Sequence, residues 1–329
     1  MRSDDRGKTW SIEQSPVDDV AISGIAVAGR DAAWVTVGSG EVYFTADGGA
    51  SWQKQGQELA ASFIEPRFVG VATAGRSVVA VGRDQLGTIG ATVNFPPMIA
   101  RSTDGGATWS PAVLLSGAHS VAPLYDACLL DSGVGLAVSN GFDGQVVFTT
   151  GDDGATWGLS YEGATALRYA CGGGSDLWLV DFEFGDGVTV TKPLRSRDAG
   201  QTWEDVSEHI PGTLSSGAES PDLSVGAIVF ADAMRGWLFG SLVVARDPET
   251  RQPTATQPTA LETFDGGDTW RKADLPLPEA DVYVALASRR HVVALGRSGG
   301  LLFSDGEWEQ FSLPAEVMVV FPEATAITD

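Results

Sequence analysis

Apolar positions along the chain come in short runs of small and β-branched residues, and turn residues separate the runs. After Trp10, the segments "SIEQ", "AISGIAVAG", "AAWVTVGSG" and "EVYFTADGG" fit four successive strands, of which the first closes one unit and the others open the next. The same order returns in "VGVATAGRSVVAVGR" from Val69 and in "VYVALASRRHVVALGRSGGLLFSDG" from Val282. No window holds a helical period over three turns. The pattern therefore predicts an all-β chain of repeated four-stranded units.

A polar turn that closes on a tryptophan accompanies these units, with the template S/T-x-D-x-G-x-T/S-W. In such a turn the Asp accepts hydrogen bonds from nearby backbone N–H groups, the Gly supplies backbone angles that other residues resist, and the Trp covers the hairpin with an apolar ring. The Asp and Trp of the six full copies are Asp5 and Trp10, Asp47 and Trp52, Asp104 and Trp109, Asp152 and Trp157, Asp198 and Trp203, and Asp265 and Trp270, and a shortened copy, "SDGEW", ends at Trp308.

This turn is identified as the Asp-box, also called the bacterial neuraminidase repeat. Successive box tryptophans are 38 to 67 residues apart, and a four-stranded propeller blade takes about 40 to 50 residues. We therefore expect one β-propeller domain over residues 1–329, with each box between the third and fourth strands of a blade. We expect seven blades, the last shared by the C-terminal strand "EVMVVFPEA" and an N-terminal strand, with six blades as the alternative.

Charge and composition narrow the possible partners. The formal net charge is −22, from 43 acids and 21 bases, so the field of the protein repels the phosphates of a nucleic acid. No stretch reaches the ~18 to 20 apolar residues of a membrane-spanning helix, and "MRSDDRGKTW" at the N-terminus has no apolar signal region. The two cysteines, Cys128 and Cys171, form no CxxC pair, and we expect no metal and no cofactor. They hold matching positions on the first strands of successive blades, which are usually too far apart for a disulfide, so two buried free thiols are preferred and a disulfide is the alternative.

Long connecting segments are expected at the end of the propeller opposite to the boxes. They are residues 55–68, 110–125 and 204–225 between blades, and residues 83–100, 181–195 and 241–262 between second and third strands. Because loops carry function more often than scaffolds do, a binding site is expected there. The candidate residues on that side, which would form a pocket for an anionic or sugar ligand or be solvated loop charges, are Arg67, Arg83, His119, Arg168, Asp181, Glu183, His209 and Arg246.

The stretch "VFADAMRGWLFGS", followed by "LETFDGGDTW", resembles the propellers of the photosystem II assembly and stability factor family. This resemblance implies a non-catalytic scaffold that binds protein partners outside the cytoplasm. Sialidases share the Asp-box, but their Arg-Ile-Pro motif is absent, and neither Tyr125 nor Tyr169 sits beside a Glu in a recognisable pair. Xyloglucanase-type propellers use two aspartates in a cleft between two propellers, for which only Asp126 and Asp181 could be suggested.

We therefore expect a monomeric, extracytoplasmic (periplasmic or secreted) propeller that binds a protein partner or a glycan through its long loops. The alternative is a glycoside hydrolase, either sialidase-like or xyloglucanase-like. The two hypotheses differ in one structural feature, since a hydrolase needs carboxyl groups that converge in a pocket.

Overall fold

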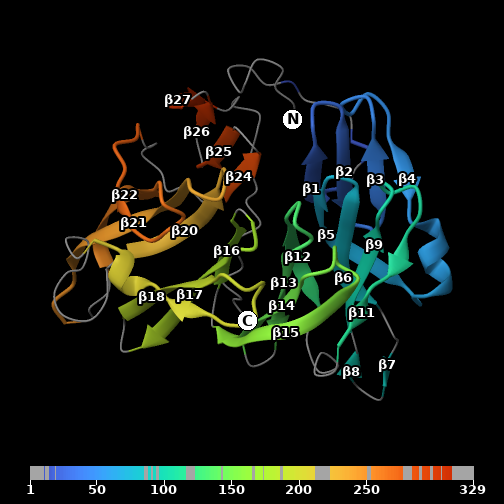
Figure 1. The fold of residues 1–329 in the computed structure, drawn as a ribbon, viewed down its shortest axis with the longest axis horizontal. Coiled ribbons are helices and arrows are strands. Elements are labelled where there is room, and N and C mark those ends of the chain that lie inside the picture. Colours follow the sequence, from blue (N-terminus) through green and yellow to red (C-terminus); the bar gives the residue numbers. More distant parts are fainter. Residues whose placement is uncertain are drawn as a thin grey trace.

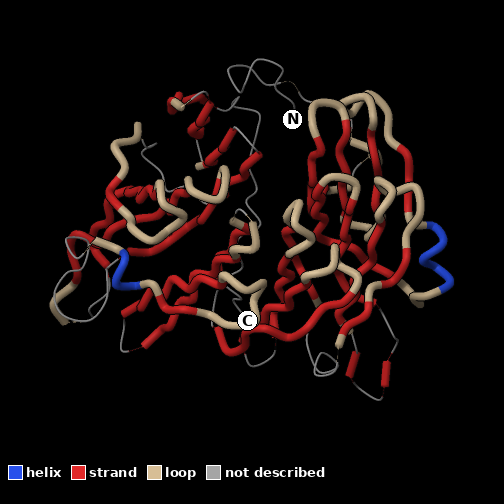
Figure 2. Tube along the Cα trace, viewed as in Figure 1, coloured by secondary structure: helices blue, strands red, loops and turns tan. Residues whose placement is uncertain are grey.

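Strands make up nearly all of the regular structure, with η1 (Gln57–Ala61) and η3 (Ser207–His209) as short 3₁₀ helices (Figure 2). The computed structural model describes residues 11, 15–18, 20–84, 88–89, 92–93, 96–115, 123–141, 144–164, 167–172, 174–185, 188–211, 223–249, 253–276, 284–288, 291–296, 299–304 and 306–312. No helix within these ranges is long and apolar enough to cross a membrane.

Six sheets of antiparallel strands follow one another along the described chain, and we call them blades 1 to 6. Blade 1 holds β1 (Ile22–Ala28), β2 (Ala32–Val37), β3 (Val42–Thr45) and β4 (Gln53–Gln55). Blade 2 holds β5 (Pro66–Ala74), β6 (Ser77–Asp84), β9 (Pro97–Ser102) and β10 (Ser110–Pro111), and blade 3 holds β12 (Leu124–Leu129), β13 (Gly135–Gly141), β14 (Gly144–Thr150) and β15 (Thr156–Ala164). Blade 4 holds β16 (Leu167–Cys171), β17 (Leu177–Gly185), β18 (Val188–Ser196) and β19 (Glu204–Asp205). Blade 5 holds β20 (Leu223–Phe230), β21 (Gly236–Arg246), β22 (Pro253–Thr263) and β23 (Arg271–Lys272), and blade 6 holds β24 (Val284–Ser288), β25 (His291–Leu295), β26 (Gly299–Ser304) and β27 (Glu307–Ser312).

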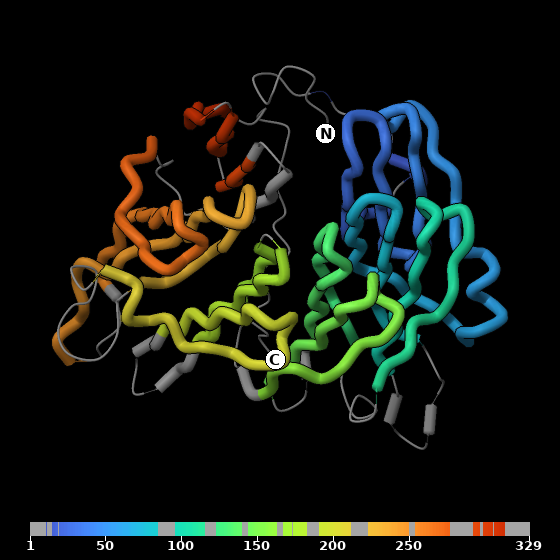
Figure 3. Tube along the Cα trace, viewed as in Figure 1, coloured from blue at the N-terminus to red at the C-terminus, as the bar shows by residue number. Residues whose placement is uncertain are grey.

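The blades are arranged in a ring, with the first strand of each blade nearest the centre (Figure 1). The chain passes around this ring in sequence order, from blue to red (Figure 3). The all-β propeller expected from the sequence is therefore confirmed, and the described residues form six blades, the alternative number. The two segments expected to build a seventh blade, the strand after Trp10 and residues 316–324, lie almost wholly outside the described residues.

The Asp-boxes occupy the predicted turns. Described boxes end the third strands β3, β9, β14, β18 and β22 and lead into the fourth strands, and the shortened copy joins β26 to β27. The first box, with Asp5 and Trp10, lies outside the described residues. The second-strand tryptophans Trp34, Trp178 and Trp237 are buried between blades, with exposed fractions of 1–3%.

Apolar cores lie between neighbouring blades, and each core takes side chains from both. Trp178 and Val180 of blade 4, for example, pack with Ile228 and Trp270 of blade 5. The template glycine of the box lies at this contact: Gly267 has φ +90°, and a Cβ added to it would lie 2.3 Å from Cη2 of Trp178. Only glycine fits both the backbone angle and the space, so the box of one blade is fitted to the second strand of the blade before it.

Two further elements decorate the ring. Blade 3 gains a fifth strand, β11 (Val113–Leu114), which pairs in parallel with the outer strand β15. A small hairpin of β7 (Thr88–Ile89) and β8 (Thr92–Val93) is inserted between the second and third strands of blade 2. Both elements belong to segments that the sequence predicted to be long loops.

The expectation of two free thiols is wrong, because Cys128 and Cys171 form a disulfide with Cα atoms 6.0 Å apart. The sequence suggested that they hold matching positions on successive inner strands. In the structure Cys128 pairs with Leu136, one residue before the last ladder pair of its hairpin, whereas Cys171 itself makes the last pair with Leu177. Because side chains alternate along a strand, this offset of one residue turns the two thiols toward each other.

Candidate functional site

The end of the blades that carries the Asp-boxes, here called the box side, is held by bonds that repeat from blade to blade. In blade 1 the Thr45 hydroxyl donates to Asp47 Oδ1 (2.7 Å) and accepts from Gly49 N (2.9 Å), while Ser51 donates to Asp47 through N (2.8 Å) and Oγ (2.6 Å). The same four bonds recur in the boxes of Asp104, Asp152, Asp198 and Asp265.

The hydrogen bonds within the boxes lower the pKa values of their Asp carboxyl groups. The hydroxyl and then the backbone N–H of Ser51 lower the pKa of Asp47 to about 2. The equivalent bonds from Thr108 lower the pKa of Asp104 to about 2. Since both oxygens of each Asp are already hydrogen-bonded within the turn, the boxes are suited to holding the hairpin rather than to acid–base chemistry.

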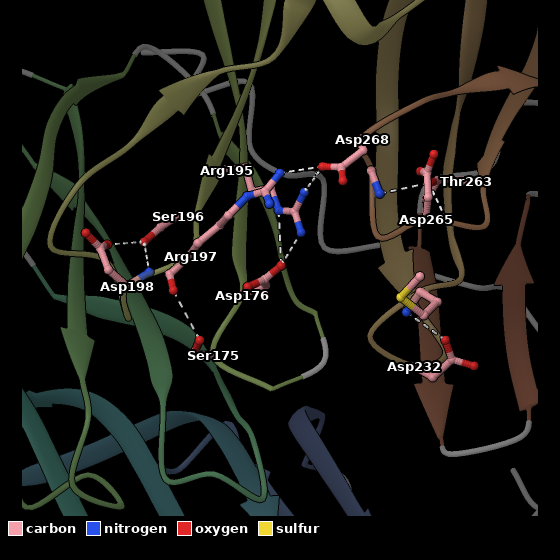
Figure 4. A network of polar contacts seen from close by, with 12 residues as sticks. Ser175, Asp176, Arg195, Ser196, Arg197, Asp198, Asp232, Thr263, Asp265 and Asp268 are labelled. Carbon is pink, nitrogen blue, oxygen red and sulfur yellow. Dashed lines mark hydrogen bonds and ion pairs between the residues drawn. The ribbon is translucent and has the colours of Figure 1, made fainter.

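A buried arginine joins two blades on the box side (Figure 4). Arg195, with 6% of its side chain exposed, pairs with Asp176 of its own blade and, at 2.8 Å, with Asp268 in the box of blade 5. Its guanidinium also lies over the Trp178 ring, 5.2 Å from the centroid. Arg197 shares the Asp268 carboxylate. Every charge in this network has a partner within the protein, so the network is structural.

The opposite end of the blades, here called the long-loop side, differs in extent from blade to blade. In blade 5 the β21–β22 ladder runs from Gly236–Thr263 to Arg246–Pro253, whereas β20 pairs only as far as Leu242. Residues 243–246 and 253–256 therefore form a two-stranded ribbon beyond the blade, which we call the blade 5 arm. Val244 on this arm is 54% exposed. An apolar side chain on an exposed ribbon offers a contact that the propeller itself does not use.

The candidate arginines of blade 2 lie together on the long-loop side. Arg67 and Arg83 are a cross-strand pair between β5 and β6. Arg67 forms a half-exposed ion pair with Glu65, with Nη2 and Oε1 3.4 Å apart. The neighbouring Asp84 is buried and accepts hydrogen bonds from the backbone N–H groups of Ile64 and Glu65, which fixes the loop that enters this blade.

The other candidates are dispersed. Asp181 is buried at 3% exposure and accepts a 2.7 Å hydrogen bond from the Tyr161 hydroxyl of blade 3. Glu183 lies two residues further along β17, and Arg246 ends β21 at the tip of the blade 5 arm. His119 lies outside the described residues.

The expected position of His209 on the long-loop side is wrong. Its Nδ1 lies 3.3 Å from the carbonyl oxygen of Gly267, and its own carbonyl accepts from Trp270 N at 3.3 Å. Both partners belong to the Asp-box of blade 5. His209 ends η3, which begins two residues after the two-residue strand β19, so the chain has not yet left the box side at this point.

One ladder position on the innermost strands holds a charged residue in blades 3 and 4 and a small residue in blades 1, 2 and 5. Gly24, Gly70 and Ala227 follow a bulge near the start of β1, β5 and β20, and Asp126 follows the bulge of β12. Arg168 holds this position in β16, because it and Asp126 both stand three residues before the last ladder pair. A Cβ at Gly24 would lie 2.8 Å from the backbone of blade 2, so small residues let inner strands touch.

Asp126 and Arg168 each have a tyrosine as their neighbour in the sequence. The four residues form what we call the inner cluster: Tyr125, Asp126, Arg168 and Tyr169. Tyr169 and Asp126 are joined by a side-chain hydrogen bond. Arg168 Nε donates to the Gly226 carbonyl at 2.8 Å and Nη1 to the Leu167 carbonyl at 3.1 Å. All four residues are partly exposed.

Burial shifts every group of the inner cluster toward its neutral form. Loss of hydration raises the pKa of Asp126, and the Tyr169 hydroxyl offsets only part of this effect. Loss of hydration also raises the pKa of Tyr169 well above 10, and it lowers the pKa of Arg168. The sequence made only Arg168 a binding candidate, and it named Tyr125, Asp126 and Tyr169 only when hydrolase roles were weighed. The missed signal is that "ISG" and "FVG" in blades 1 and 2 correspond to "LYD" in blade 3.

Comparison with known proteins agrees with this architecture. The BNR/Asp-box repeat model matches residues 100–111. No curated protein matches the sequence. Among solved structures, a prolyl endopeptidase is similar with a TM-score of 0.57 and 14% identity over 95% of this chain and 44% of that chain. The GH74 xyloglucanase from Xanthomonas campestris gives a TM-score of 0.51 and 14% identity over 88% of this chain and 47% of that chain.

A third similar structure, "YCF48 bound to D1 peptide", is 17% identical over 90% of this chain and 94% of that chain, with a TM-score of 0.45. This chain spans less than half of the xyloglucanase and of the prolyl endopeptidase. At such identities a likeness shows the fold alone. The repeat match, the five described boxes and the ring of blades together show that the chain is a β-propeller carrying the BNR/Asp-box repeat.

Proposed function

We propose that the protein is a non-catalytic propeller scaffold that binds a protein partner or a glycan through its long-loop side. The observation that carries this proposal is the blade 5 arm. Its strands extend past the inner strand β20, and Val244, Ala245 and residues 254–256 are exposed. A ribbon that contributes nothing to its own blade is best explained by contact with another molecule.

The protonation behaviour of the inner cluster supports a binding role over catalysis. A tyrosine nucleophile needs a phenol that ionises readily, yet burial raises the pKa values of both Tyr125 and Tyr169. Asp181, suggested by the sequence as an acid or base, is buried and hydrogen-bonded to Tyr161. Among the described residues, no group of three His, Cys, Asp or Glu side chains is placed to hold a metal ion.

The proposal is tested by two substitutions in the same blade. Val244 on the arm and Met234 on the box side are 54% and 53% exposed, so Val244→Asp and Met234→Asp disturb folding to a similar, small extent. Proteins captured from the native host, and a glycan array, are first screened with the wild-type chain. Binding of each hit to purified variants is then measured by calorimetry.

We expect Val244→Asp to weaken binding at least tenfold and Met234→Asp to leave it unchanged. Replacement of residues 243–256 by a two-residue turn should abolish it. Equal affinities of the two single variants, or loss only in Met234→Asp, would place the contact elsewhere and overturn the proposal.

A second candidate, a carbohydrate-active hydrolase, is favoured by one observation. Tyr169 and Asp126 form a hydrogen-bonded pair on neighbouring inner strands, with Arg168 beside them. Such a pair is the kind of group that the sequence did not reveal. A screen against fluorogenic sialosides and β-glycosides decides the matter: turnover that disappears in both Asp126→Asn and Tyr169→Phe would favour the hydrolase over the scaffold.

We also propose that the protein works outside the cytoplasm. The support is the Cys128–Cys171 disulfide between blades 3 and 4, since disulfides form and persist mainly in oxidising compartments. Cell fractionation with trapping of free thiols tests this directly. Both cysteines should be recovered oxidised in an extracytoplasmic fraction, and recovery as free thiols in the cytoplasm would contradict the assignment.

A further inference from the structure

The inner cluster costs free energy that a purely structural position would avoid. At the ladder position of Asp126 and Arg168, the inner strands β1, β5 and β20 carry Gly24, Gly70 and Ala227. The glycines allow close strand contact, as a Cβ at Gly70 would lie 2.9 Å from the Asp126 Cα. A charged side chain in the same layer loses hydration instead. Such a departure from the repeat at two adjacent blades indicates a site.

Arg168 differs in its partners from four other arginines of blades 4 and 5. The described arginines Arg195, Arg197, Arg235 and Arg271 each pair with a carboxylate. Arg168 donates instead to two backbone carbonyls and lies over the Phe182 ring, 5.6 Å from the centroid. Within the described part of the chain, no carboxylate forms an ion pair with it. A partly buried guanidinium of this kind is stabilised when a ligand supplies the negative charge.

We propose that the inner cluster binds a carboxylate group, with Arg168 as its charged partner. The Tyr125 hydroxyl already donates to Gln145 Oε1 at 3.4 Å and the Tyr169 hydroxyl is bonded to Asp126, so both tyrosines shape the site rather than bind the ligand. Arg168 and Tyr125 are the second residues of β16 and β12, the ends of these strands that face the long-loop side. This inference rests on the proposed function, because the ligand that carries the carboxylate enters from that side. A carboxylate fits the guanidinium because both are planar and can form two parallel hydrogen bonds.

The net charge of −22 gives the site a distinctive salt dependence. The long-range field of the protein repels an anion, and salt screens this repulsion. The contact with Arg168 is short and partly buried, so salt screens it less. The affinity for a carboxylate should therefore stay level or rise between about 20 and 150 mM salt. An exposed basic patch would show the opposite trend.

Calorimetric titration of the purified full chain tests the site without its natural partner. The probes are N-acetyl-alanyl-alanine with a free carboxylate, the same peptide as its C-terminal amide, D-glucuronate, D-glucose and sulfate. We expect the two carboxylates to bind and the amide and glucose not to bind. The stronger of the two carboxylates tells whether the group comes from a peptide end or from a sugar acid.

Arg168→Gln should weaken carboxylate binding at least tenfold, and Arg76→Gln is the matched control. Arg76 lies on the box side, where its Nη2 donates to the Asp104 carbonyl at 3.3 Å, so its loss should leave binding unchanged. If Arg168→Gln fails to fold by circular dichroism, Arg168→Lys replaces it, with an expected loss of three- to tenfold because an ammonium group cannot form two parallel hydrogen bonds to a carboxylate.

Three results would overturn the inference: equal binding of carboxylate and amide, unchanged binding after the substitution, or sulfate binding as tightly as the carboxylates. These failures are distinct from failure of the proposed function, which is decided by Val244→Asp and Met234→Asp. A chain that keeps its arm-dependent partner but binds no small carboxylate retains the scaffold role and loses this site.

Discussion

The box side and the innermost strands of the propeller are both built from repeats, but only the box side repeats its chemistry. Each described Asp-box makes the same bonds among a hydroxyl, an Asp and a Gly N–H. On the inner strands the corresponding ladder position changes from Gly70 to Asp126 to Arg168 along three successive blades. Uniform positions thus serve the scaffold, and the position that varies marks where a ligand would be recognised.

The two regions also differ in how far the loss of one interaction is expected to affect stability. A box is locally self-bonded, so its loss affects one hairpin and its contact with the previous blade. The inner strands β12 and β16 are joined by individual cross-links, the Asp126–Tyr169 hydrogen bond and the Cys128–Cys171 disulfide. The following experiments are designed to break or sharpen this contrast.

Removal of the disulfide should have the largest effect. The bridge closes a segment of 43 residues between blades 3 and 4, and the loss of such a cross-link lowers the free energy of unfolding by about 4 kcal/mol. Urea unfolding of the Cys128→Ser/Cys171→Ser double variant measures this. Wild-type protein unfolded in reducing agent should match the variant, and a loss below about 1 kcal/mol would mean that the inner strands are held by packing alone.

The next largest effect is expected at the contact between a box and the preceding blade. Gly267→Ala places a Cβ against the Trp178 ring at a φ of +90°, and overpacking together with the left-handed backbone should cost about 2–4 kcal/mol. Gly105→Ala is the control, since Gly105 has φ +77° but no atom within 4 Å of the added Cβ. It should lose only about 1 kcal/mol. Equal losses in thermal or urea unfolding would show that backbone angle, not interblade fit, selects these glycines.

A smaller effect separates two box tryptophans. Trp157 Nε1 donates to the Gly154 carbonyl at 3.0 Å, whereas the buried Trp270 Nε1 has no acceptor within the described residues. The acceptor equivalent to Gly154 is Gly267, whose carbonyl lies beside His209 Nδ1. Trp157→Phe should therefore destabilise the protein by about 1–2 kcal/mol more than Trp270→Phe. The difference is read from paired chemical unfolding curves, and a greater loss in Trp270→Phe would refute the assignment of these bonds.

The smallest effect is a pH dependence of opposite sign in the two regions. The pKa of Asp104 is lowered to about 2 in the folded protein, so its contribution to stability is present above its unfolded pKa near 4 and is lost as the pH falls toward about 2. Burial raises the pKa of Asp126, so its ionisation reduces stability as the pH rises above about 4.

Asp104→Asn should accordingly reduce the loss of unfolding free energy as the pH falls below about 4. Asp126→Asn should reduce the loss of unfolding free energy as the pH rises above about 4. Unfolding curves at a series of pH values test both slopes. If both variants change the pH profile in the same direction, the electrostatic contrast between the regions does not hold.

The repeats were predictable from the sequence because the residues that stabilise each Asp-box turn lie within the same eight-residue segment. The Asp, Gly and Trp of a box specify its turn locally, and blade length and strand order follow from box spacing. The structure describes six blades, and the segments predicted to form a seventh lie almost wholly outside the described residues.

Features that depend on register or on distant partners were not predictable. A one-residue offset between β12 and β16 decides whether Cys128 and Cys171 meet, and no local pattern encodes it. The Tyr169–Asp126 pair and the attachment of β11 to β15 likewise join residues from different blades. His209 was misplaced because the length of β19 was not apparent from its sequence.

Hydrogen exchange of the chain, alone and with its captured partner, tests most directly that binding takes place on the long-loop side. We expect protection of the β21–β22 arm, residues 243–246 and 253–256, and of the starts of β12 and β16, with the Asp-box turns unchanged. Protection confined to the box turns at residues 45–52, 102–109 and 263–270, with the arm still exchanging freely, would contradict the account.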